Sequence, residues 1–191
     1  MAMLAREVLE GMGFSHLGHN VQISDKASIY GAGHISIGDN VRIDDFCLIS
    51  AGAGGIEIGK FVHIAGFSSL IGAGKITLCD FSGLSSRVSI YSSNDDYSGA
   101  MLTNPTVPSE FTGVTHADVY LDEHVIVGSG SIILPGVTLG KGVAVGAISV
   151  VNRDCAEFGI YAGNPAKRIK ERRRDLLVVA DAFLESISNQ A

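Results

Sequence analysis

Six consecutive six-residue units between Leu121 and Ala156 constrain the fold of this chain more than any other stretch. They read LDEHVI, VGSGSI, ILPGVT, LGKGVA, VGAISV and VNRDCA, and each begins with Leu, Ile or Val. This period is typical of a parallel β-helix, in which each unit forms a short strand and a corner. Three units complete a triangular coil, and the aliphatic residue points inwards, stacked on its counterparts about 4.8 Å away. An α-helix would require apolar residues three and four positions apart, which the run lacks.

The same units recur upstream, in coils that begin at Leu17, Ile37, Ile58 and Leu78. Residues in excess of three complete units always follow the third unit, and the phrases GAGHISI, GAGGIEI and GAGKITL mark this corner. The coil from Leu78 carries a much longer insertion there, at about residues 94–119. Insertions in repeat proteins map to one face, which often binds ligands. We therefore expect this insertion, called the excursion below, to form part of a functional site.

The composition fits a solenoid with tight corners, because 24 of the 191 residues are glycine, 46% are apolar and none is tryptophan. We expect an N-terminal helix and cap at residues 1–16, a β-helix domain at 17–156 and a C-terminal segment at 157–191. The helix predicted in this last segment should cap the open end of the solenoid. The formal net charge of −6 argues against nucleic acid as a partner.

No apolar run approaches the roughly 18 residues of a membrane span. The N-terminus lacks the basic start and long apolar stretch of a secretory signal. We therefore expect no integral membrane segment and a cytoplasmic location. The three cysteines show no metal-ligand spacing, and Cys47 and Cys155 fall at interior positions of their units. We interpret them as structural thiols and predict no metal site.

The units, the excursion and the phrase YAGNPAKRIKER together resemble the hexapeptide-repeat acyltransferases. The sequence is most similar to the galactoside O-acetyltransferase and xenobiotic acetyltransferase group, over about residues 17–174. The resemblance implies a left-handed parallel β-helix with a long excursion and a C-terminal α-helix. It also implies a homotrimer with active sites between subunits, and acetyl-CoA as the co-substrate.

The resemblance further implies which residues bind acetyl-CoA. Ser129 and Ala147 would lie on one coil edge and bond the pantetheine amides through their backbone. The residues that would hold the nucleotide end are Asn152, Arg153, Lys167 and Lys170. Cationic side chains suit this end, because CoA carries a pyrophosphate and a 3′-phosphate.

The catalytic residues are harder to assign, because the histidine of the family at the start of the excursion is replaced by the stretch SSNDDYSG. His116 closes the excursion and returns to the same edge, so it is our candidate general base. Asp95 would orient this imidazole or be the base itself. Asn94, Asp96 and Tyr97 are candidates for binding the acceptor. We interpret the other histidines as surface or structural residues.

The sequence thus predicts an acetyl-CoA-dependent acetyltransferase that acts on a hydroxyl or amine of a sugar or sugar nucleotide, in surface polysaccharide biosynthesis. A non-sugar small-molecule acetyltransferase and a structural β-helix without activity remain alternatives. A γ-type carbonic anhydrase is disfavoured, because the chain has no H-x4-H spacing for zinc. The Thr-x-Thr ladders of ice-binding solenoids are also absent from the sequence.

Overall fold

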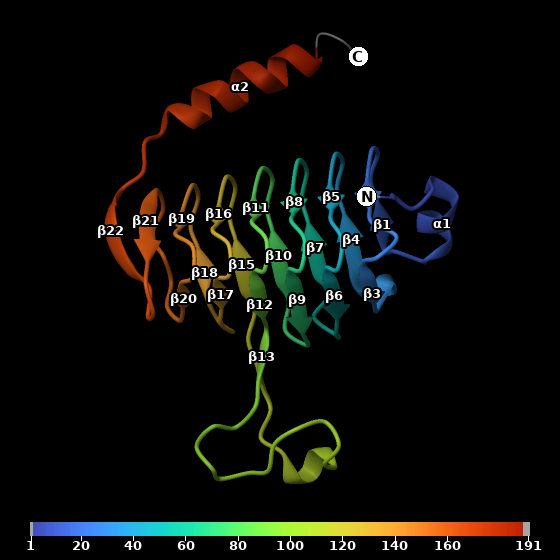
Figure 1. The fold of residues 1–191 in the computed structure, drawn as a ribbon, viewed down its shortest axis with the longest axis vertical. Coiled ribbons are helices and arrows are strands. Elements are labelled where there is room, and N and C mark those ends of the chain that lie inside the picture. Colours follow the sequence, from blue (N-terminus) through green and yellow to red (C-terminus); the bar gives the residue numbers. More distant parts are fainter. Residues whose placement is uncertain (1, 189–191) are drawn as a thin grey trace.

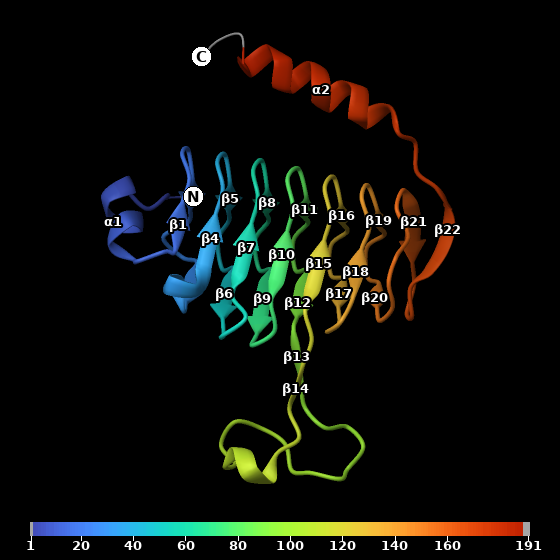
Figure 2. The same cartoon turned by 180° about the vertical axis from the view of Figure 1, so that it is seen from behind.

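The computed structural model describes residues 2–188, which form a left-handed parallel β-helix of three sheets (Figures 1 and 2). The first sheet contains β1 (His16–Leu17), β4 (Ile35–Ile37), β7 (Ile56–Ile58), β10 (Ile76–Leu78), β15 (Val119–Leu121) and β18 (Thr138–Leu139). The second contains β2 (Gln22–Ile23), β5 (Arg42–Ile43), β8 (His63–Ile64), β11 (Gly83–Leu84), β16 (Ile126–Val127), β19 (Ala144–Val145), β21 (Gly159–Ala162) and β22 (Lys167–Glu171). The third contains β3 (Ser28–Tyr30), β6 (Leu48–Ala51), β9 (Ser69–Gly72), β12 (Ser89–Tyr91), β17 (Ile132–Ile133) and β20 (Val150–Val151). The predicted all-β solenoid is confirmed.

The predicted coil starts lie directly above one another in the first sheet. The residues paired in register are Leu17, Ile37, Ile58, Leu78, Leu121 and Leu139. All except the half-buried Leu17 are at most 3% exposed. The register survives because every extra residue lies at the corner between the third and first sheets, outside the paired strands. One of these extra segments forms the 3-10 helix η1 (Ala32–His34).

The two ends of the β-helix are closed differently. Helix α1 (Arg6–Gly11) covers the N-terminal end and buries Leu9, which is 1% exposed. Beyond Ala156 the second sheet continues into β21, and the chain then reverses into the antiparallel strand β22. Within residues 2–188, no helix is both long and apolar enough to cross a lipid bilayer.

Helix α2 (Asp175–Ser188) runs back along the corner between the first and second sheets (Figure 1). The prediction that it caps the open end is therefore wrong. Phe61 and Phe81 stack at this corner with ring centroids 4.9 Å apart. Phe183 of α2 packs edge-on against Phe61 at 5.2 Å. These aromatic contacts hold the helix along the corner, whereas β22 occupies the end of the second sheet.

The inward positions should dominate the stability of this fold. Ile64 is 0% exposed in β8, so Ile64→Ala removes a buried side chain and should lower the free energy of unfolding by about 2–5 kcal/mol. Ile169→Ala in β22 is the control, because Ile169 is 62% exposed, and should change it by less than about 0.5 kcal/mol. Urea denaturation measures both values, and equal losses would contradict the inward stack.

Candidate functional site

The excursion projects from the β-helix on a two-stranded stalk (Figure 1). Strands β13 (Ser93–Asn94) and β14 (Thr115–His116) pair antiparallel, with Ser93 opposite His116. Ser93 Oγ lies 2.8 Å from His116 Nδ1. The two ends of the excursion therefore meet, as expected, but the hydrogen-bond partner of the imidazole is Ser93 and not Asp95. Thr115 and His116 are both exposed.

Asp96 organises the loop beyond the stalk. Its two carboxylate oxygens accept hydrogen bonds from the backbone N–H groups of Ser98 and Met101, each at 2.8 Å. The hydrogen bonds of the Ser98 hydroxyl and of these N–H groups lower the pKa of Asp96. The turn of the 3-10 helix η2 (Ser109–Phe111) completes the loop. Asp96 thus has a structural task that the sequence alone did not reveal.

Asn94 and Asp95 line a pocket of 720 Å³ between the excursion and Ile71 of β9. Its walls include Val107, Pro108 and Val114. Asp95 is half-buried, and no hydrogen bond or ion pair holds its carboxylate among residues 2–188. A carboxylate in this state can receive a cationic or hydrogen-bond-donating ligand. Tyr97 does not line the pocket and is 86% exposed.

Four of the six residues expected to bind the co-substrate fall on two different corners. Ser129 and Ala147 lie on successive coils between the second and third sheets, where Ile148 N donates to Ser129 O at 2.9 Å. Asn152 and Arg153 follow β20, at the corner from which the excursion leaves, and Asn152 shares a small pocket with Asn94. The two groups therefore do not meet within one chain.

Lys167 and Lys170 lie on β22, which extends the second sheet past the coil of Ala147. Lys167 pairs with Ala162 and Lys170 pairs with Ile160. All residues of β22 are exposed, so both ammonium groups are open to an anionic ligand. They form a cationic end to the edge that carries Ser129 and Ala147.

A shallow hollow of 290 Å³ opens on the outer face of the second sheet. Gly83 forms its floor, and a Cβ placed there would meet no atom within 4 Å. The register places His63 and Ile126 on either side of Gly83, and Ser85 and Ser129 also line the hollow. No motif in the sequence pointed to this site. The signal was a glycine at an outward strand position, which often marks a close approach to a ligand or another backbone.

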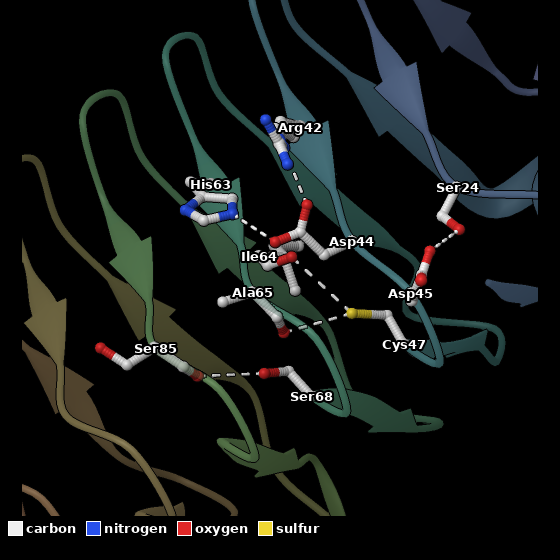
Figure 3. Close-up of polar contacts among 10 residues, drawn as sticks. All are labelled: Ser24, Arg42, Asp44, Asp45, Cys47, His63, Ile64, Ala65, Ser68 and Ser85. Carbon is white, nitrogen blue, oxygen red and sulfur yellow. Dashed lines mark hydrogen bonds and ion pairs between the residues drawn. The ribbon is translucent and has the colours of Figure 1, made fainter. Parts of the chain in front are cut away.

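A carboxylate holds His63 at the edge of this hollow (Figure 3). His63 Nε2 lies 2.9 Å from Asp44 Oδ2, and Arg42 Nε donates to Asp44 Oδ1 at 2.8 Å. Burial would raise the pKa of Asp44, but hydrogen bonds from Arg42 and His63 outweigh it and lower that pKa. Asp44 is thus a charged and nearly buried anchor for the imidazole. No group of three or more potential metal-ligating side chains occurs in the described part of the chain.

Comparison with known proteins places these features in context. The chain is 54% identical over 186 residues to the dTDP-4-amino-4,6-dideoxy-D-glucose acyltransferase of Escherichia coli, covering 97% of each protein. An aspartate-to-asparagine variant of AntD, an N-acyltransferase from Bacillus cereus crystallised with dTDP and coenzyme A, has a TM-score of 0.93 and 44% identity. That match covers 97% of this chain and 100% of the other. A maltose O-acetyltransferase from Clostridium difficile shares the fold, with a TM-score of 0.60, 21% identity and coverage of 88% and 74%. No protein-family model matches the sequence.

The hydrogen bonds of Asp96 make the order of the excursion testable. Asp96→Ala should expose the excursion to limited proteolysis at neutral pH, because two backbone N–H groups lose their acceptor. Asp95→Asn is the matched control and should leave the cleavage rate unchanged. Folding lowers the pKa of Asp96. The wild-type excursion should therefore stay protected from proteolysis as pH falls through the usual aspartate range, and should become sensitive only at pH values below that range. Equal cleavage of both variants would contradict this role.

Proposed function

The chain belongs to the hexapeptide-repeat sugar acyltransferases, and from this we propose that it transfers an acetyl group from acetyl-CoA to the amino group of dTDP-4-amino-4,6-dideoxyglucose. The predicted class, a sugar acyltransferase that uses acyl-CoA, is confirmed. Similarity to an enzyme over 97% of the chain also removes the structural β-helix without activity as an alternative. The Escherichia coli relative is named for this acceptor, and AntD was crystallised with it and with coenzyme A.

The observation that carries the choice of an amine is the free carboxylate of Asp95. It lines the excursion pocket without a partner in residues 2–188. An ammonium group pairs with such a carboxylate through a charge-assisted hydrogen bond, whereas a sugar hydroxyl gains less from it. Asn94 lines the same pocket and offers an amide to the sugar ring.

The sequence interval between two substituted residues of AntD points to a second residue of the proposed site. AntD was crystallised with replacements of an aspartate and of a serine ten positions before it. In this chain Ser85 precedes Asp95 by the same interval, and Ser86 precedes Asp96. The carboxylate of Asp96 is occupied by the loop backbone, which favours the first pair. We therefore add Ser85, in the hollow over Gly83, to the proposed site.

Ser85 and Asp95 lie at different corners of one chain, so we propose that a homotrimer completes the site. The excursion of one subunit would bring Asp95 to the hollow of its neighbour. The excursion also exposes apolar side chains suited to such a contact, namely Tyr97, Met101, Leu102 and Phe111. We place this reaction in the cytoplasm, on the route to a surface polysaccharide.

In the proposed reaction the acceptor ammonium first loses one proton to solvent, and the neutral amine nitrogen then attacks the thioester carbonyl carbon. The C–S bond breaks, the CoA thiolate leaves, and the second proton lost from nitrogen passes to a base and then to the thiolate. His116 is our candidate for that base. Asp95 would hold the acceptor ammonium until its first proton leaves, or act in place of His116 as the base for the second proton. Ser129 and Ala147 would position the pantetheine arm.

A transfer assay tests this proposal. The wild-type protein with acetyl-CoA should add one acetyl group to dTDP-4-amino-4,6-dideoxyglucose and none to dTDP-glucose, as followed by CoA thiol release and product mass. His116→Ala should lower kcat by about 10²–10⁴-fold with little change in CoA affinity. Asp95→Asn should mainly raise KM for the amino sugar, because it removes the partner of the ammonium.

Two results would contradict these roles. Acetylation of both sugar nucleotides at similar rates would rule out a site built for an amine. Near-full activity of His116→Ala beside an inactive Asp95→Asn would assign the base to the carboxylate.

The cationic end of the co-substrate edge makes a separate prediction. Lys167→Ala and Lys170→Ala should weaken CoA binding more than dephospho-CoA binding if either ammonium contacts the 3′-phosphate. Each charge-assisted contact should contribute about 1.5–3 kcal/mol. Isothermal titration calorimetry measures both ligands, and equal weakening of the two would place the 3′-phosphate elsewhere.

A further inference from the structure

The hollow over Gly83 lies at the end of the edge that is expected to bind acetyl-CoA. On one side are Ser129 and Ala147, followed by the exposed lysines of β22, which suit the phosphates of CoA. The thioester end of CoA would therefore reach the hollow from the C-terminal coils. An acceptor that meets it there must approach from the opposite direction, so the rest of its nucleotide would extend over the N-terminal coils.

The outward residues on that side are basic. In register, the second sheet presents Gly83, then His63, then Arg42 towards the N-terminus. His63 lines the hollow itself, and its side chain is 52% exposed. No other residue that lines the hollow is titratable. A diphosphate leaving the hollow in this direction would pass directly over the imidazole.

The hydrogen bond to Asp44 orients this imidazole. It engages Nε2, and Figure 3 shows the second ring nitrogen turned away from Asp44. No contact within residues 2–188 occupies this second nitrogen, Nδ1. When protonated, His63 can donate from Nδ1 to a ligand while Asp44 holds the other side of the ring. Asp44 is itself shared with Arg42, so the three side chains carry one net positive charge in that state and none when His63 is neutral.

We propose that His63, positioned by Asp44, binds the diphosphate of the nucleotide-sugar acceptor, while the sugar ring occupies the hollow over Gly83. This inference rests on the function proposed above and extends it to residues outside the excursion. His63 is a binding residue in this scheme, and Asp44 is a positioning residue. The absence of a side chain at Gly83 makes room for the sugar beside Ser85.

Binding of dTDP-glucose tests the role of His63, because this ligand carries the diphosphate but no amino group. His63→Gln should bind it about 10-fold more weakly than wild type, because the variant lacks the ring nitrogen that would contact the diphosphate. His34→Gln, at an exposed position on η1, is the matched control and should behave as wild type.

A second variant tests the hollow. Gly83→Val should fold, because the added carbon meets open space and its strand neighbour is Ile126. It should lose at least about 10-fold in affinity for dTDP-glucose and keep its affinity for CoA. Light scattering should give the same assembly mass for all these variants.

The outcomes separate this inference from the function on which it rests. A His63→Gln variant that binds dTDP-glucose as wild type does would overturn the inference alone. The same holds if it loses only kcat, because His63 would then act in the chemistry. A wild-type protein that neither binds dTDP-glucose nor acetylates the amino sugar would overturn the proposed acceptor and this inference together.

Discussion

The stacking of inward aliphatic side chains in register is the interaction on which the rest of this structure depends. In the second sheet Ile43, Ile64, Leu84, Val127 and Val145 form one such column, each at most 3% exposed. Because every coil repeats this contact, the outward positions and corners are held at fixed spacing along the whole β-helix. The frame sets the spacing of the binding surface, and contacts such as Asp44–His63 then orient individual side chains on it.

Functional residues must therefore lie at positions that the core does not use. Inward positions are filled by the stack, so ligand contacts can come only from outward strand positions, corners and insertions. The hollow exists because Gly83 omits one outward side chain, and the excursion exists because the corner between the third and first sheets tolerates extra residues. The Asp44–His63 pair follows the same rule, since it joins outward groups of successive coils.

The candidate groups on one chain are distributed over two corners and one face. Asp95 stands on the excursion, whereas Ser85, His63 and Ser129 surround the hollow on the second sheet. A rigid triangular frame cannot bend to bring them together. In the proposed trimer, the excursion of a neighbouring subunit would close this separation, and catalysis would then depend on assembly.

The sequence by itself determined the β-helix. Its six-residue period buries one aliphatic residue per unit when three units form a triangular coil and the coils stack. It also predicted the coil starts and the corner of the insertions, and it pointed to Asp95 and His116 as residues of the excursion. Only the tertiary structure revealed that Ser93 contacts His116, that Asp96 serves the loop, and that His63 is held by Asp44 beside a hollow. Ser93 and His116 are 23 positions apart in the sequence, and Asp44 and His63 are 19 apart. The contacts of Asp96 depend on the backbone geometry of the loop. Neither a repeat period nor a motif encodes which outward side chains of neighbouring coils come within hydrogen-bonding distance.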